Sequence, residues 1–168
     1  MSTLTERDYI NQIEAAFKTY LAGKFSADSL VEVRTGYPDL TNRTPLSKVL
    51  ITIYCESSQV ESSGYDEMIE KTPELELRAK VAKSTVCIDV WTSRGDANNP
   101  SKTGGRAGVQ RYISSTVWEL TNNDKDFYSL YPDVDIDDVS HKYTRSPESF
   151  DNIDLFQGHI EVLASFPI

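Results

Sequence analysis

The last strand-like segment of the chain constrains the fold most. Between Phe156 and Phe166, apolar residues occupy every second position and polar residues lie between them. The apolar set is Phe156, Gly158, Ile160, Val162, Ala164 and Phe166. A period of two is typical of a strand with one buried face and one face in water. Such a strand predicts a sheet that is covered on one side by another layer.

Two segments have the helical spacing that such a layer requires. Ile10, Ile13, Phe17, Tyr20 and Leu21 recur at intervals of three and four, which predicts a helix over residues 6–22. Its start resembles a capping box at residues 5–8, and Gly23 suits its end. Val109, Tyr112, Ile113, Val117 and Leu120 have the same spacing and predict a second helix over residues 106–120.

Four further segments favour strands. Residues 30–34 alternate, and residues 49–55 are apolar on both faces, which places them centrally in a sheet. Residues 75–91 alternate in two phases, which indicates a bulge or a tight turn near residues 83–84 and hence one long kinked strand or a hairpin. Residues 139–145 also suit a strand.

Polar and acidic connections separate these elements. Residues 57–72 predict a surface insertion with a helical turn at residues 66–70. Residues 93–105 predict a loop, and residues 122–138 an acidic connection without regular structure. No repeat or linker divides the 168 residues. The sequence therefore predicts a single α+β domain over residues 1–168, with an antiparallel or mixed sheet and two main helices packed on it.

Composition narrows the function classes. The formal net charge of −9 disfavours binding to a nucleic-acid backbone, although it also simply favours solubility. The two cysteines, Cys55 and Cys87, lie among apolar residues and predict buried free thiols rather than a disulfide. The chain has neither a signal-peptide profile at its start nor an apolar run of about 20 residues. We therefore expect it to fold in a cytoplasm, with no membrane partner.

The sequence motifs that could indicate a nucleotide-binding or metal-binding site each lack required residues. The segment from Gly95 to Thr103 lies between a strand and a helix, but Ser101 precedes Lys102 where a phosphate-binding loop requires glycine. Residues 133–138 resemble the start of a calcium loop but lack its glycine and its final glutamate, which leaves open a weak cation site between subunits. His141 and His159 are expected at solvent-facing strand positions without metal-ligand spacing. The sequence thus predicts no catalytic residue, metal or cofactor, and a protein that is not an enzyme.

The order of elements resembles that of the tail terminator (tail completion) proteins of long-tailed bacteriophages. The resemblance rests on the N-terminal amphipathic helix, the strand from Pro45 to Cys55, the strand ending Val86–Trp91, the helix of residues 106–120 and the closing strand ending at Phe166. It covers almost the whole chain as element order and strand texture, without a diagnostic motif. The longer acidic segments at residues 57–72 and 122–138 depart from the shorter members.

The resemblance implies a structural virion protein in the neck region, assembled in the host cytoplasm. Its partners would be further copies of itself in a ring, commonly a hexamer, together with the tail tube protein and a head–tail connector or head-completion protein. DNA would pass through the acidic lumen without specific binding. Arg94, Lys102 and Arg106 are candidate contacts with a neighbouring ring or subunit. Two alternatives remain: a different neck protein, such as a head-completion protein or connector adaptor, and a small ligand-binding domain or enzyme with a cleft beside residues 93–105.

Overall fold

The computed structural model describes residues 8–36, 46, 48–62, 68–72, 75–78, 80–93, 104–150 and 153–167. Within these ranges the chain forms three helices and seven strands. The helices are α1 (Tyr9–Lys24), α2 (Gly105–Thr121) and α3 (Asp124–Leu130). The strands are β1 (Val31–Thr35), β2 (Val49–Ser62), β3 (Met68–Thr72), β4 (Leu75–Arg78), β5 (Lys80–Ser93), β6 (Asp135–Phe150) and β7 (Ile153–Pro167).

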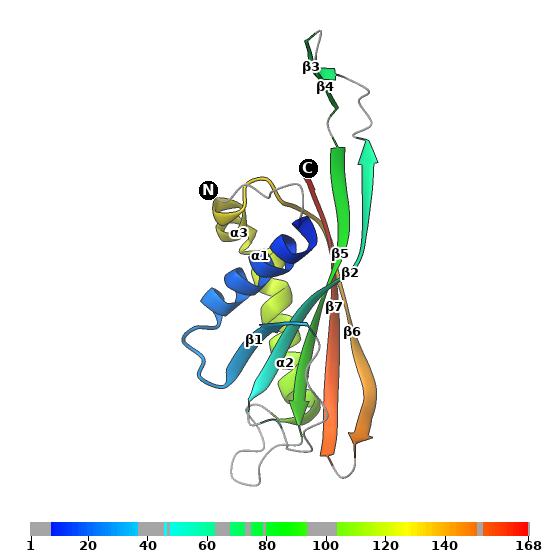
Figure 1. Ribbon diagram of the computed structural model, residues 1–168. Helices are drawn as coiled ribbons and strands as arrows, with labels where there is room; N and C mark the ends of the chain where they lie inside the picture. Colours follow the sequence, from blue (N-terminus) through cyan, green and yellow to red (C-terminus); the bar gives the residue numbers. More distant parts are fainter. Residues whose placement is uncertain are drawn as a thin grey trace.

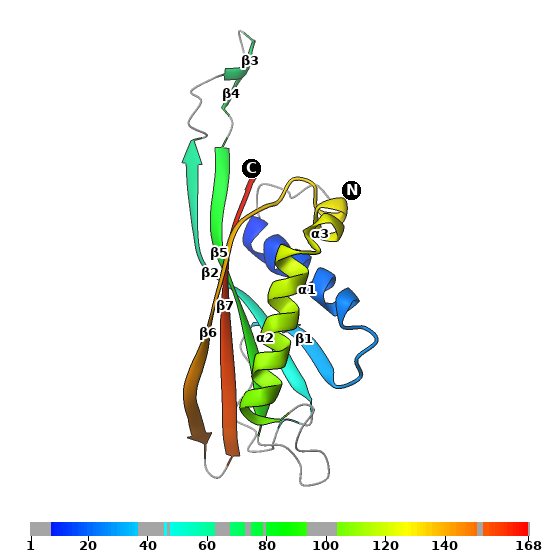
Figure 2. The same cartoon turned by 180° about the vertical axis from the view of Figure 1, so that it is seen from behind.

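Five of the described strands form one mixed sheet in the order β1-β2-β5-β7-β6. β1 is parallel to β2, and the other neighbours are antiparallel. Helices α1 and α2 lie against the same face of this sheet (Figures 1 and 2). Strands β3 and β4 form a separate ladder beyond the end of β2 and the start of β5. The predicted α+β class with helices packed on a mixed sheet is therefore confirmed.

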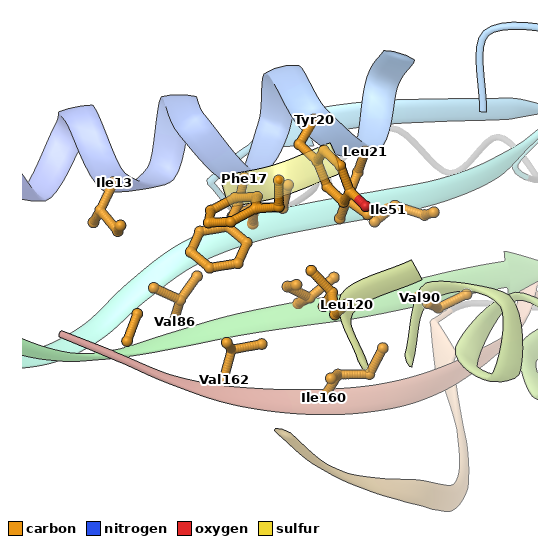
Figure 3. Packing of buried hydrophobic residues seen from close by; sticks show 14 of the residues in the cluster. Ile13, Phe17, Tyr20, Leu21, Ile51, Val86, Val90, Leu120, Ile160 and Val162 are labelled. Carbon is orange, nitrogen blue, oxygen red and sulfur yellow. The ribbon is translucent and has the colours of Figure 1, made fainter. Parts of the chain in front are cut away.

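The core lies between the helices and the sheet. Figure 3 shows α1 directing Ile13, Phe17, Tyr20 and Leu21 towards the strands. The strands contribute their own buried residues to the same cluster, including Ile51, Val86, Val90, Ile160 and Val162. These side chains are among those with the largest apolar area, and their removal from water supplies the main driving force for folding.

Aromatic packing attaches the short helix α3 to the core. The ring of Phe127 is fully buried, and its centroid lies 4.9 Å from that of Phe17 and 5.2 Å from that of Tyr20. Tilted and edge-on contacts at these distances suit the charge distribution of aromatic rings. The Tyr20 hydroxyl donates to the backbone carbonyls of Glu119 and Asn123, both at 3.0 Å. Phe127 and Tyr20 thus join α1, the end of α2 and α3 into one layer.

A glycine in β7 sets the separation between the sheet and α2. A Cβ atom at Gly158 would lie 2.0 Å from Cδ1 of Ile113 and 2.6 Å from Cγ1 of Val109. Both distances are far below van der Waals contact. Gly158 therefore allows α2 to pack directly on the backbone of β7.

Several predicted boundaries differ from the structure. The first helix runs over Tyr9–Lys24 and not over residues 6–22, while residues 5–7 of the predicted capping box lie outside the described residues. The predicted helical turn at residues 66–70 is wrong where it can be compared, because Met68–Thr72 is a strand that pairs with β4. The acidic connection of residues 122–138 contains α3 and the start of β6, so the prediction of irregular structure there is also wrong.

The change of alternation phase in residues 75–91 does not arise from a bulge in β5. The pairing of β5 with β7 is continuous from Val81 to Ser93. The irregularity lies in the partner strand β2, between Cys55 and Ser57. The predicted bulge or tight turn near residues 83–84 is therefore wrong, and β5 forms one long strand rather than a hairpin with itself.

Candidate functional site

The sheet face away from the helices, called here the open face, has a polar row across its middle. The strand registers place Arg34, Thr52, Asp89, His159 and Lys142 side by side on five neighbouring strands. Asp89 and Thr52 are fully buried although the helices cover the opposite face. Burial of a carboxyl group requires compensation by hydrogen bonds or opposite charge, so this row is a candidate functional site.

His159 lies between two carboxyl groups. Its Nδ1 is 2.5 Å from Oδ1 of Asp89, and its Nε2 is 3.1 Å from Oε1 of Glu161. The imidazolium form, in which both ring nitrogens donate, satisfies both contacts at once. The other carboxylate oxygen of Asp89, Oδ2, is buried and has no hydrogen-bond partner within the described part of the chain. The arrangement holds the imidazole ring in place, with a carboxylate oxygen at each of its two nitrogens.

Cys87 is the thiol closest to this group in the strand register, opposite Glu161. Its Sγ donates to Oε2 of Glu56 at 3.6 Å. Burial, followed by the negative charge of Glu56, raises the pKa of the Cys87 thiol to about 12. The thiolate is the reactive form of cysteine, so this environment suppresses nucleophilic chemistry at neutral pH.

The two histidines, for which the sequence predicts the same environment, differ in exposure in the structure. His141 is exposed on β6, as expected. The expectation of a solvent-facing His159 is wrong, because its side chain is only 13% exposed and is bonded to Asp89. A signal for this pair exists in the sequence: Asp89 interrupts the apolar run Val86–Trp91, where a lone acid implies a buried charge that needs a partner.

The weak cation site predicted at residues 133–138, at the start of β6, stays a prediction. No group of three or more His, Cys, Asp or Glu side chains that could hold a metal ion occurs among the residues that the structure describes. Asp137 lies at an irregularity in the pairing of β6 with β7, and its Oδ1 accepts a hydrogen bond of 3.2 Å from Ser165. A single chain therefore provides no complete set of ligands in its described part.

Of the three predicted contact residues, the structure places one. Arg94 and Lys102 lie outside the described residues, as does the phosphate-loop-like segment from Gly95 to Thr103. Arg106 is in the first turn of α2, and its guanidinium carbon lies 5.3 Å from the centre of the Tyr143 ring on β6. This cation–π contact brings Arg106 to the outer strand of the sheet.

The lateral edges of the sheet carry backbone groups that no described strand pairs. Within the described strands, β5 and β7 have neighbours on both sides, whereas β6 pairs only with β7. β1 pairs with residues 49–53 of β2, so among the described strands residues 56–62 of β2 pair only with β5. Unpaired N–H and C=O groups of an edge strand are a template for another strand.

Three large apolar side chains on the described helices are exposed, among them Ile10 on α1 at 41%. Trp118 on α2 is 53% exposed and Leu130 at the end of α3 is 55% exposed. Leu130 borders a shallow hollow of about 420 Å³ between α1 and α3, which Thr19, Gly23 and Asp126 also line. Exposed aromatic and aliphatic residues of this size are common at protein interfaces.

No helix within the described ranges is long and apolar enough to cross a lipid bilayer. The chain matches no protein-family model, and a search of curated proteins finds no match to it.

Proposed function

We propose that this protein is a structural assembly subunit of a bacteriophage tail that forms a ring at the head-proximal end of the tail tube. The ring, a hexamer in this proposal, ends polymerisation of the tube and offers a docking face to the head connector or head-completion protein. It acts by binding and occlusion, and no step requires a cofactor or a catalytic residue.

The observation that carries the proposal is the form of the sheet. Helices cover one face, and the two lateral edges of the sheet lie on opposite sides of the subunit with backbone groups that no described strand pairs. A subunit with two different and opposite binding edges associates head to tail, and such contacts close into rings when the rotation between copies is right. The resemblance in element order to tail terminator proteins points to the same kind of assembly.

The charge of the chain also supports this function. A net charge of −9 gives a ring whose electrostatic field repels the DNA backbone. DNA passing through such a ring would be repelled rather than held. The protein is then a component of the virion neck that is assembled in the host cytoplasm.

Polymerisation of the tail tube protein from the same genome provides the test. The purified protein is added during polymerisation, and tube lengths are measured by negative-stain electron microscopy. We expect shorter tubes with added density at one end. Tubes of unchanged length, without density at either end, would contradict the proposal.

Charge reversal in the loop predicted from the sequence tests the docking face. The double variant Arg94→Glu/Lys102→Glu should fold normally but block joining of tails to heads in a particle assembly assay. Normal particle yield from this variant would remove the loop from the interface. Loss of joining with tube capping retained would assign the loop to the head-proximal side.

A further inference from the structure

The β3–β4 ladder extends the chain away from the helical layer. β2 and β5 stay paired as far as Ser62 and Lys80, and the ladder belongs to the connection between these two residues. Figure 1 shows the ladder beyond the end of β2 and the start of β5, roughly in line with both strands and away from the three helices. Residues 63–79 are called here the arm, and β3 and β4 are its described strands.

The ladder of the arm is a weak structure by itself. β3 and β4 pair with each other and are not part of the five-stranded sheet. Their pairing joins Met68–Thr72 to Leu75–Arg78 and is irregular between Met68 and Glu70. A short two-stranded ladder is marginally stable in water unless a further strand or another surface packs against it. A partner that binds the arm would therefore also stabilise it.

The composition of the arm indicates the chemistry of that partner. Five acids and two bases in residues 63–79 give the arm a net charge of −3, namely Asp66, Glu67, Glu70, Glu74 and Glu76 against Lys71 and Arg78. The two strands also contain four apolar residues, Met68, Ile69, Leu75 and Leu77. Opposite charge across an interface speeds encounter and selects the partner. A protein surface with an apolar centre and basic residues around it fits this composition.

The place of the arm along β5 indicates which neighbour it meets. The arm precedes Lys80, the first residue of β5, whereas the loop of residues 94–103 follows Ser93, the last one. The length of the strand separates these two ends by about 45 Å. In a ring that closes through the lateral edges of the sheet, the axis runs along the strands, so the arm and the loop lie on opposite faces of the ring. The loop is the proposed docking face for the head, which leaves the arm on the side of the tail tube.

We infer that the arm is the element that docks onto the end of the tail tube, where its acidic ladder packs on a basic and partly apolar surface of the tube protein. This inference rests on the proposed function and names the tube-binding element of the ring. It leaves the lateral edges of the sheet to contacts between subunits.

Removal of the arm provides the first test. Ser62 and Lys80 are direct partners in the strand register, so a two-residue Asn-Gly turn in place of residues 63–79 closes β2 and β5 into a tight hairpin. The core residues labelled in Figure 3 all lie outside this deletion, and thermal unfolding checks that the fold is kept. By light scattering, the armless protein should associate like the wild type. In the tube-capping assay, tubes should be as long as those grown without added protein.

Charge reversal tests the chemistry of the partner without shortening the chain. The variant Glu70→Lys/Glu74→Lys should need at least about tenfold more protein for half-maximal shortening of the tubes. Asp133→Lys/Asp138→Lys is the matched control, because both acids are exposed outside the arm and the change in net charge is equal. The control should cap like the wild type. Capping by the wild type should also weaken as the salt concentration rises, because salt screens exposed charges.

The outcomes separate the arm from the function. An armless protein that caps tubes as well as the wild type would overturn the inference and leave the proposed function standing. So would an armless protein that stays monomeric where the wild type associates, because the arm would then act between subunits. Equal capping by the arm variant and its matched control would refute the basic partner surface. A wild-type protein that does not shorten tubes would contradict the proposed function itself.

Discussion

Nδ1 of His159 lies 2.5 Å from Oδ1 of Asp89, and the two residues are direct partners on β7 and β5. Asp89 is fully buried, so its carboxyl group depends on this contact for compensation of its charge. The pair lies in the middle of the open face, which the helices do not cover. It is a structural element of the sheet.

Replacement of His159 should be strongly destabilising. His159→Ala leaves the Asp89 carboxyl buried without its partner, a change that typically costs about 3–5 kcal/mol of unfolding free energy. Asp89→Asn combined with His159→Gln should cost less, because the charge is removed together with its partner. Urea unfolding measures both variants, and His141→Ala serves as the exposed control, expected within about 0.5 kcal/mol of the wild type. A His159→Ala protein as stable as this control would show that the pair does not stabilise the fold.

The two thiols should never form a disulfide with each other. Cys55 is opposite Val86 and Cys87 is opposite Tyr54, so the cysteines occupy adjacent ladder positions on opposite faces of the sheet. Both are free in the structure. In the native protein at pH 8, a thiol reagent should label the half-buried Cys55 before Cys87, whose pKa is raised to about 12 by burial. Rapid labelling of Cys87 by the thiol reagent in the Cys55→Ala variant would contradict this order.

Alkaline pH should weaken the fold through Tyr20. Burial raises the pKa of its hydroxyl from 10.0 to about 12, because ionisation would place a charge inside the helical layer. The folded state therefore holds this proton more tightly than the unfolded state. The associated stability is complete below pH 10 and is lost as pH rises towards 12.

Urea midpoints measured between pH 8 and pH 11 test the Tyr20 prediction. Tyr20→Phe should be less stable at pH 8, by about 1 kcal/mol for the lost hydrogen bonds, but its stability should fall less steeply above pH 10. An identical alkaline slope in both proteins would remove Tyr20 as a source of the pH dependence. The remaining slope is expected from Tyr112, whose hydroxyl donates to Asp28 and whose pKa is likewise raised to about 12 by burial.

Gly158→Ala should be destabilising by about 1–3 kcal/mol, the usual cost of forcing extra atoms into a packed core. The added Cβ would overlap Cγ1 of Val109 and Cγ1 of Ile113, and both are β-branched side chains with few alternative χ1 rotamers in a helix. Thermal unfolding measures the loss, and adding Ile113→Ala to Gly158→Ala should lower the cost of the glycine replacement. Gly23→Ala is the matched control: its Cβ meets nothing within 4 Å, and in a helix it should stabilise by up to about 1 kcal/mol. Equal stability of Gly158→Ala and wild type would refute the close-packing argument.

The elements with a strong local pattern could be predicted from the sequence. The alternation from Phe156 to Phe166 lies within β7, and the helical spacing around Ile113 lies within α2. The run at residues 49–55 is part of β2, and its Leu50 and Ile51 are buried on opposite faces. In β7 and α2 one residue period directs apolar side chains to a common face, and in β2 an uninterrupted apolar run supplies both faces. In each case the information is contained in neighbouring residues.

The polar segments could not be predicted in the same way. Asp124–Leu130 has little apolar periodicity, and it becomes helical where Phe127 packs against Phe17 and Tyr20 from a distant part of the chain. The early part of β6 is acidic and is a strand because its backbone pairs with β7. Tertiary contact overrides weak local preference in both places.

The sequence by itself determined that this chain forms an α+β domain with a half-buried strand near its end and two amphipathic helices, because those patterns repeat over a few residues. Only the tertiary structure decided which strands are neighbours, that Asp89 meets His159, that Cys55 and Cys87 lie on opposite faces, and which edges of the sheet stay open among the described strands. These relationships depend on strand order and register. Both are set by contacts between residues tens of positions apart, which no local period encodes.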